Sequence, residues 1–303
     1  MQKKFPYGGM AVIEGVMMRG PARTSIAVRK SDGTILVDEQ PNSDWGKRFP
    51  FLKWPFIRGT FVLIESLVVG IKMLNYSANL ALDEEEDELS WGEILLTMVV
   101  AFGMAILLFM VLPTAIVHYL QGFLAGPWTQ NLVEGIIRIA FFFLYVIAIA
   151  RMPDIARVFM YHGAEHKTIF AYEAGEPLTV ENVKKHPCLH PRCGTAFLLI
   201  VMIISIVVFA LLGEGDLWYR IWSRLAVLPV VAGLGYEFLK LSGRYYGKGW
   251  LNWLIAPGLW MQRLTTREPD HAQMEVAIAA LQRILDDNAP NLLAEARTNQ
   301  ASG

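Results

Sequence analysis

The sequence predicts a mainly α-helical polytopic membrane protein with about four transmembrane helices, a small N-terminal β-rich cytoplasmic element and peripheral amphipathic helices. Three observations predict this class. Hydrophobic residues make up 54% of the 303 residues and charged residues only 18%, less than the roughly 25% of a typical soluble domain. Two long segments contain no charged side chain, and Lys and Arg gather in alternate connections between the apolar segments.

Two apolar segments are long enough to cross a bilayer without a charge. Residues 94–117 and residues 194–213 contain no Asp, Glu, Lys or Arg, and roughly 20 apolar residues suffice to span the hydrocarbon. Each is therefore predicted to be a transmembrane helix, because a buried helix of a soluble protein is rarely so long and so apolar.

Two further segments, residues 134–150 and 221–239, are predicted to span as well, although they carry charges. The charges lie near the ends of the segments, where long side chains can reach the membrane interface. The residues concerned are Glu134, Arg138, Arg224 and Glu237.

The distribution of Lys and Arg predicts the sidedness of these spans. Residues 118–132 contain neither residue type, and residues 213–220 contain only Arg220. Residues 151–193 contain six, and the N-terminal segment and the residues after 242 are also basic-rich. Since short basic loops stay in the cytoplasm, the pattern predicts a multi-pass protein of the cell membrane with both termini cytoplasmic.

Residues 1–50 are predicted to form the β-rich cytoplasmic element. TSIAVRK and TILVDEQ read as two short strands around an Asp-Gly turn. The segment is too short for a core of its own, so it is expected to pack on the rest of the protein. Glu14 and Arg19 are charges in an otherwise apolar stretch, which predicts an internal ion pair between them.

Residues 51–90 are predicted to hold an amphipathic helix and an acidic linker. Arg58, Glu65 and Lys72 recur every seven residues and form one stripe, opposite an apolar stripe. This helix is expected to lie on the membrane surface or beside the bundle, and DEEEDE at 83–88 follows as a solvated link.

The membrane domain is predicted to cover residues 91–265, and residues 266–303 a C-terminal amphipathic helix and polar tail. Within the first range, residues 249–264 combine tryptophans with a central Pro-Gly, which indicates an interfacial or re-entrant segment. The apolar face of the last helix is expected to consist of Val276, Ala279, Ala280 and Ile284.

The loop at 151–193 carries the residues that point to chemistry. Pro153 and Asp154 are typical of a first helical turn, and the helix is expected to run to about Tyr172. Within it, YHGAEHK places His162 and His166 four residues apart on one side, a spacing of helical zinc sites. Glu165 lies on the adjacent stripe, and the order H-x-x-E-H is that of inverted zinc proteases.

A second group of soft or borderline zinc ligands follows about twenty residues later, in HPCLHPRCGT. Its members are His186, Cys188, His190 and Cys193. A cytoplasmic location keeps both thiols reduced, which favours metal ligation over a disulfide. The two groups together predict one metal site, provided that the loop brings them into contact.

Two alternatives for these residues stay open. His162 and His166 can simply form hydrogen bonds with Glu165 and Glu173 in an ordinary helix. Cys193 can also act as a nucleophile with His190 or His162 as its base, although no third residue that would orient the base is evident.

The motifs GGMAVIEGVMMRGP, YHGAEHKTIFAYE and HPRCGTAFL occur in this order, and with them the chain resembles the YqhQ-like family of bacterial multi-pass membrane proteins. The resemblance covers most of residues 6–265. Members of this family often carry the label of predicted metal-dependent enzymes, so the resemblance implies a metal site. It points to His162, Glu165, His166, His190, Arg192 and Cys193, and leaves His186 and Cys188 outside the motif.

The leading functional hypothesis is a zinc-dependent hydrolase of a membrane-proximal substrate. Its metal ligands would be His162, His166 and either His190 or Cys193, with Glu165 as the catalytic general base. If all four ligands bind at once, the zinc is structural. The other hypothesis is a non-catalytic scaffold or assembly factor that brings a cytosolic or membrane protein partner to the bilayer.

Two further functions are disfavoured. A net charge of −1 and a pI near 6.6 argue against nucleic acid as a partner. Transport ranks last, because the two charge-free spans offer no charged group at membrane depth. The sequence predicts no particular oligomeric state.

Overall fold

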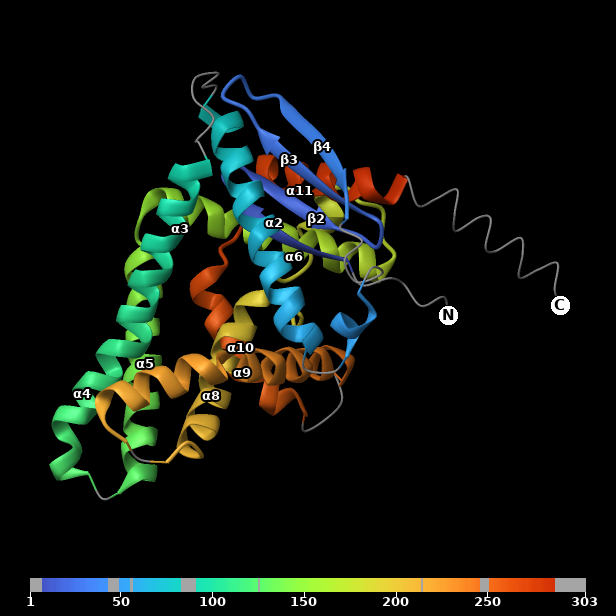
Figure 1. Ribbon diagram of the computed structural model, residues 1–303. Coiled ribbons are helices and arrows are strands. Elements are labelled where there is room, and N and C mark those ends of the chain that lie inside the picture. The colour runs from blue at the N-terminus through green and yellow to red at the C-terminus, as the bar shows by residue number, and fades with distance from the viewer. Residues whose placement is uncertain are drawn as a thin grey trace.

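The protein has a sheet-containing part at one end and a group of long helices at the other (Figure 1). The computed structural model describes residues 7–42, 49–54, 57–82, 91–124, 126–213, 215–245 and 251–286. The acidic run at 83–88 and the polar tail after residue 286 lie outside the described residues. The chain is mainly helical with one small antiparallel sheet near the N-terminus, as the sequence predicts at that level.

The sheet is an antiparallel meander in the order β1-β2-β3-β4. The predicted strand pair is confirmed, with Gly33 at a φ of 84° in the turn, where glycine meets no steric penalty. The preceding hairpin was not predicted, because its second turn residue, Glu14, adopts a φ of 50° without being glycine. The strands are β1 (Gly8–Val12), β2 (Gly15–Arg19), β3 (Arg23–Arg29) and β4 (Ile35–Pro41).

Both faces of the sheet are covered, and the alternation of side chains along β2 shows how. Val16 and Met18 pack with helices α6 (Pro153–Ala174) and α11 (His271–Asp286), while Met17 between them faces α2 (Ile57–Leu82). Side chains alternate between the faces of a strand, so a strand buried on both sides is apolar throughout. This core joins the N-terminal residues, the middle of the chain and α11.

The predicted apolar face of α11 is confirmed for three of its four positions. Val276, Ala280 and Ile284 are almost fully buried in the core with the sheet and α6. Ala279 is partly buried and packs against the same core.

The short α7 packs in the core with α6 and α11, and the remaining helices extend away from the sheet (Figure 1). A π-helical turn at Leu107–Val111 joins α3 and α4. In Figure 1, α9 runs across the direction of α5 rather than alongside it. The bounds are α3 (Trp91–Ile106), α4 (Leu112–Leu120), α5 (Pro127–Ile149), α7 (Val180–Val183), α8 (Gly194–Ala210), α9 (Leu217–Tyr245) and α10 (Leu251–Thr265), with 3-10 turns at Pro50–Lys53 and Gln121–Phe123.

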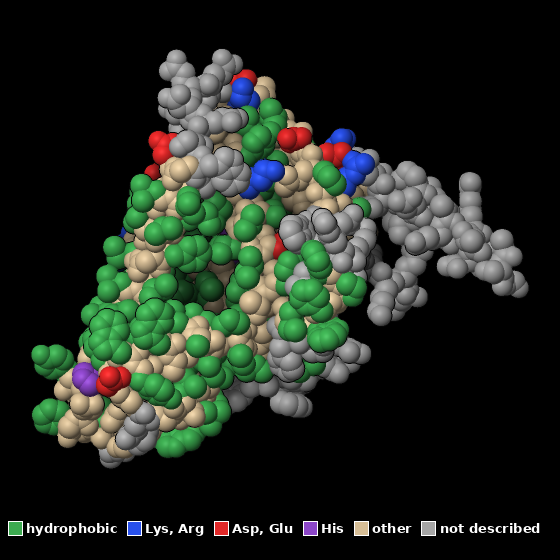
Figure 2. Space-filling model, viewed as in Figure 1, with side chains coloured by type: hydrophobic (Ala, Val, Ile, Leu, Met, Phe, Trp, Pro, Cys, Tyr) green, Lys and Arg blue, Asp and Glu red, His purple; other side chains and the backbone are tan. Residues whose placement is uncertain are grey.

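Two helical stretches within the described residues have the length and composition to cross a membrane. They are Leu95–Phe123 and Trp128–Ile149, with mean hydropathies of 2.8 and 2.3. Of the most apolar 18 residues, only 6% are buried in the first stretch and 22% in the second. Figure 2 shows hydrophobic side chains covering this part of the surface. The apolar helix α8 is shorter, at 17 residues, so the four-span count stays a prediction.

Helix α2 turns its charged stripe toward the protein. Arg58 pairs with Glu237 of α9, and Glu65 pairs with Arg19 of β2 at 2.9 Å. The predicted ion pair between Glu14 and Arg19 is therefore wrong. The two residues point to different neighbours, and Glu14 binds Arg157 of α6 instead.

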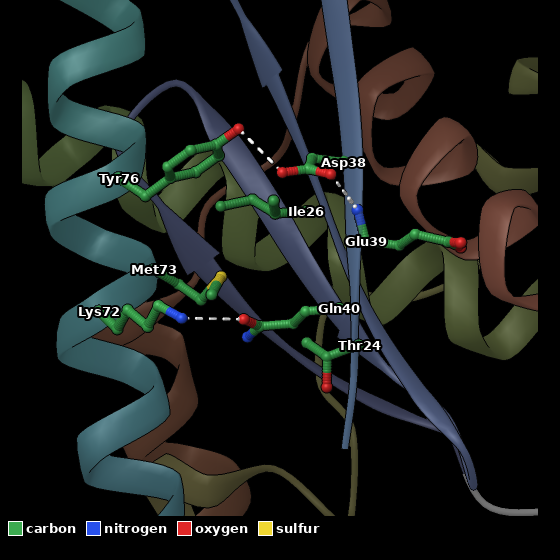
Figure 3. Close-up of a pocket in the computed structure, with 8 residues that line it drawn as sticks. All are labelled: Thr24, Ile26, Asp38, Glu39, Gln40, Lys72, Met73 and Tyr76. Atoms are coloured by element: carbon green, nitrogen blue, oxygen red, sulfur yellow. Dashed lines mark hydrogen bonds between the residues drawn. The ribbon is translucent and has the colours of Figure 1, made fainter. Parts of the chain in front are cut away.

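A small cavity of about 140 Å³ lies where α2 meets β3 and β4 (Figure 3). Its polar side chains bond to one another across the gap. The Tyr76 hydroxyl donates to Asp38 at 3.0 Å, and Lys72 Nζ donates to Gln40 at 3.1 Å. These bonds fix the second half of α2 on the outer strand of the sheet.

Candidate metal centre

Helix α6 positions the two predicted histidine ligands. It begins with Pro153, which has no N–H to leave unpaired there, and ends at Gly175, which adopts the left-handed conformation with a φ of 78°. The predicted helix is confirmed. Its middle is buried on all sides rather than along one stripe, because the sheet and α11 both pack against it.

Three of the predicted ligands converge. His162, His166 and Cys193 each offer a ligand atom, and these atoms all lie within 4.8 Å of one another. The two imidazole centroids are 4.4 Å apart, as expected one turn apart on a helix. Cys193 Sγ lies 3.2 Å from His162 Nε2. The loop therefore folds so that both sequence motifs meet.

Backbone carbonyl groups set the tautomer of both imidazoles. His162 Nδ1 lies 2.8 Å from the carbonyl oxygen of Thr265, and His166 Nδ1 contacts the carbonyl oxygen of Cys188. A carbonyl oxygen only accepts, so each Nδ1 carries the proton and each Nε2 keeps a lone pair. Metal-bound histidines are oriented in this way by a carbonyl or carboxylate on the other ring nitrogen.

Cys193 is held by the start of α8. It is the N-cap residue, and its sulfur accepts a hydrogen bond from the Thr195 N–H at 3.4 Å. The Thr195 hydroxyl lies 3.1 Å from the same sulfur. Because a helix N-terminus favours negative charge, this position suits a thiolate ligand.

Glu165 lies beside the two imidazoles and is almost fully buried. Its Oε2 is 3.7 Å from His166 Nε2 and 3.9 Å from His162 Nε2. Burial raises the pKa of Glu165 to about 6, against the lowering effects of His162 and of a hydrogen bond from the Gly9 backbone. A carboxylate with a pKa near 6 can take up and release a proton near neutral pH.

His190, the remaining predicted ligand, lies next to the three convergent residues rather than among them. Its ring centroid is 5.5 Å from that of His166, and its Nε2 is 3.7 Å from Glu173 Oε2. Burial lowers the pKa of His190, which Glu173 partly opposes. Gln262 of α10 bonds to both the backbone N–H and the carbonyl of His190 at 2.8 Å, so this position is fixed.

The two ligands that the resemblance leaves outside the motif bind elsewhere. His186 Nε2 lies 3.2 Å from Glu176, and Cys188 Sγ donates to Glu268 at 3.3 Å. Burial and this bond raise the pKa of Cys188 to about 12, which makes it a poor nucleophile. Arg192 pairs with Glu173 and so acts on His190 through that carboxylate.

Sequence reasoning missed three residues that shape the site. Thr265 and Gln262 come from α10, about a hundred and about seventy residues from their partners. Gly9 of β1 lies against Glu165 so closely that a Cβ there would come within 2.8 Å of Glu165 Cγ. The glycine pair in the first motif was the available signal, because glycine marks a close approach of backbone to another group.

Comparison with known proteins identifies the family. The family model described as "Protein of unknown function (DUF1385)" matches residues 54–287. The "Uncharacterized protein YqhQ" of Bacillus subtilis (strain 168) is 35% identical over 292 residues, which cover 92% of each chain. This chain belongs to the YqhQ-like family.

The family match includes the whole of the candidate centre. His162, Glu165, His166, His190 and Cys193 all fall within the matched residues, whereas β1 to β4 precede them. No solved structure is similar to this YqhQ-like protein at a significant level.

Proposed function

We propose that this protein is an integral membrane protein with a zinc site on its cytoplasmic face, at which a membrane-proximal substrate such as a peptide or lipid is hydrolysed. The observation that supports it most is the convergence of His162, His166 and Cys193, in which each imidazole keeps a lone pair on Nε2. Two nitrogens and one thiolate are ligands that zinc prefers.

The number of convergent ligands favours catalysis over a purely structural role. Catalytic zinc sites have three protein ligands and one exchangeable position, whereas structural sites are closed by four. Bound zinc would acidify a water molecule and polarise a carbonyl group. Glu165, next to both imidazoles, would accept the proton of the attacking water and later give it to the leaving group.

A structural zinc site is the second candidate, and the burial of the residues favours it. Glu165 is only 4% exposed and Cys193 only 6%, and β1 covers Glu165. A fourth ligand from Glu165 or His190 would close the coordination. The metal would then join α6 to the start of α8.

The first experiment measures metal content. The full-length protein is purified in mild detergent and its zinc is quantified by mass spectrometry. We expect about one zinc per chain, and at least a tenfold loss in His162→Ala, His166→Ala and Cys193→Ser. His186→Ala and Cys188→Ser are matched controls, since both residues bind outside the convergent group. Zinc-free wild-type protein, or equal loss in the controls, contradicts the proposed metal site.

A second experiment separates the two candidates. Cobalt(II) substituted for zinc gives visible spectra that respond to each ligand, so the thiolate charge-transfer band should disappear in Cys193→Ser. An exchangeable position predicts that added azide changes the spectrum and that the spectrum varies with pH in the wild type. A spectrum that ignores azide and pH indicates a closed structural site.

The surface of the long helices supports the membrane location. Large apolar side chains point outward along α3 and α5, as Val99 does at 60% exposure and Leu144 at 62%. Exposed apolar surface on this scale marks contact with lipid or with a partner protein. Exposed aromatic side chains gather at the end of the helices remote from the sheet, as in the aromatic belt of a membrane interface. They belong to the last turn of α4, the 3-10 turn after it and the first turns of α5 and α9, and are Tyr119, Phe123, Trp128, Trp218 and Trp222.

A further inference from the structure

A second cluster of buried polar side chains lies among the apolar helices, at the end away from the sheet. Helix α5 supplies two amides, a carboxylate and an arginine along one and two turns of the helix. Helix α9 supplies two arginines one turn apart, and α4 and α8 each supply a hydroxyl group. All of these residues are less than a tenth exposed. They are Gln130, Asn131, Glu134 and Arg138 of α5, Arg220 and Arg224 of α9, Thr114 of α4 and Ser205 of α8.

One carboxylate serves two of the arginines. Glu134 Oε1 accepts from Arg138 Nη2 at 2.7 Å and pairs with Arg224 Nη1. The other donors of these two guanidinium groups also find partners. Arg138 binds the Ser205 hydroxyl at 3.0 Å and the Phe109 carbonyl at 2.8 Å, and Arg224 binds the Thr114 hydroxyl and Asn131.

Among the described residues, no carboxylate pairs with Arg220 as Glu134 pairs with the other two arginines. Its Nη2 donates to the amide oxygen of Gln130, while its Nη1 is buried and has no hydrogen-bond partner. With three arginines against one glutamate, the cluster carries a net formal charge of two positive units. A buried charge without a counterion is strongly unfavourable in a medium of low dielectric constant.

We propose that Arg220, next to the charged Arg224, forms a binding site for a phosphoryl anion between α4, α5 and α9. The planar guanidinium group pairs bidentately with phosphate oxygens and keeps its charge when buried. The free Nη1 of Arg220 is the donor that such an anion would occupy, and its charge would balance the cluster. The hydroxyl and amide groups of Thr114 and Gln130 already orient the two arginines.

Two sources of this anion fit the position. The cluster lies near the exposed tryptophans Trp218 and Trp222, and such residues sit at the depth of lipid headgroups. Glu134 is seven residues from the start of α5, about 10 Å along the helix axis. The anion is therefore the phosphate of an acidic lipid headgroup or free inorganic phosphate.

The test uses full-length protein that has been extensively delipidated in detergent. Its melting temperature is measured with inorganic phosphate, with phosphatidylglycerol and with zwitterionic phosphatidylcholine. We expect one of the first two to stabilise the wild type well above phosphatidylcholine, and at least tenfold weaker binding to Arg220→Gln. Stabilisation by phosphate identifies a free anion, and stabilisation by phosphatidylglycerol alone identifies a headgroup.

Arg151→Gln is the matched control, since Arg151 is an exposed arginine at the opposite end of α5, and it should bind as the wild type does. If Arg220→Gln does not fold, two other measurements test the site. They are anion binding by Arg220→Lys and the amount of phosphorus that stays tightly bound to the purified wild-type protein. The lysine variant keeps the charge without the bidentate geometry, so weakened binding supports the site. No stabilisation of the wild type by either anion, or equal binding by wild type and Arg220 variants, overturns the proposal.

Discussion

At the scale of single residues, Gly163 allows α6 to approach the segment after α10. A Cβ at this position would lie 2.1 Å from the carbonyl oxygen of Arg267, a backbone atom that cannot move away alone. We expect Gly163→Ala to lower the free energy of unfolding by about 1–3 kcal/mol, the usual cost of overpacking. The measurement is thermal unfolding of the purified protein in detergent.

Gly103→Ala provides the control for this substitution. Gly103 lies in α3, and a Cβ there would meet no atom within 4 Å. The variant should melt close to the wild type. Equal melting temperatures for both variants and the wild type would show that α6 and the segment at Arg267 are not in close contact.

An ion pair between the first hairpin and α6 predicts a dependence on pH. Hydrogen bonding to Arg157 holds the pKa of Glu14 below its ordinary value of 4.5, although burial opposes this. A carboxyl group whose pKa is lower in the folded state stabilises the fold at pH values above its pKa in the unfolded chain. This stabilisation is lost as the pH falls through the pKa of the folded state. Arg157→Met should therefore lower stability by less than about 1 kcal/mol at pH 7.

The difference between Arg157→Met and the wild type should shrink as pH falls below 4.5. Chemical denaturation between pH 7 and pH 3.5 measures it, with Arg151→Met as an exposed control that shows no such trend. A difference that stays constant over this range would mean that the Glu14 carboxylate is not the partner that matters.

The sequence predicted the ligands of the candidate site better than their surroundings. The four-residue spacing of His162 and His166 is a local property of a helix, so it could be read directly. Cys193 followed from the clustering of soft ligands. Thr265 left no local signal, and the glycine pair at Gly9 marks a close approach without naming its partner, because both roles arise only when α10 and β1 pack on α6.

At the scale of elements, α2 shows how a correct pattern can leave orientation open. The sequence predicted an amphipathic helix with Arg58, Glu65 and Lys72 on one stripe. Helix α2 is present, and all three side chains bind other parts of the protein, although Lys72 stays exposed. Its apolar side chains point outward, with Ile64 at 55% and Val68 at 57% exposure. A helix beside lipid is expected to face this way, but periodicity alone does not tell lipid from protein core.

The pairing of α2 with α9 can be tested by exchanging charges. Arg58 Nε donates to Glu237 Oε1 at 2.6 Å, and both side chains are about a quarter exposed. Arg58→Glu or Glu237→Arg alone places like charges together and should lower the melting temperature. The double variant should recover most of the loss, with a coupling energy of about 0.5–3 kcal/mol. Additive losses in the double variant would show that the two helices do not pair through these residues.

At the scale of the whole molecule, the sheet-containing part is assembled from distant stretches of chain. Ser25 of β3 donates to the carbonyl oxygen of Ala280 in α11, 255 residues away, at 2.6 Å. From the sequence, the N-terminal β-rich element and the C-terminal amphipathic helix were predicted as separate segments, because each pattern is local and does not show which segment packs on which. Their common core places the N-terminal sheet, the α6 region and α11 on one side of the apolar helices, which is the arrangement that the predicted topology, with both termini in the cytoplasm, requires.

The number of membrane crossings depends on α8 and α9. The end of α8 and the start of α9 lie away from the sheet (Figure 1), and Asp216, just before α9, is outside the cell if this pair crosses the bilayer as the sequence predicts. Helix α9 runs across α5 in Figure 1, so a shallow, non-crossing arrangement is the competing topology. Two single-cysteine variants, Asp216→Cys and Glu181→Cys, distinguish the two arrangements. Both are made in a protein in which Cys188 and Cys193 have been replaced.

The reagent is a membrane-impermeant maleimide added to intact bacterial cells whose outer membrane has been permeabilised. Four spans predict that the Asp216→Cys variant reacts at least tenfold faster than Glu181→Cys, because Asp216 then lies outside and Glu181, which follows α6, lies inside. In inside-out vesicles the order should reverse. Slow labelling of Asp216→Cys in intact cells, with fast labelling after detergent is added, would leave only α3–α4 and α5 as spans.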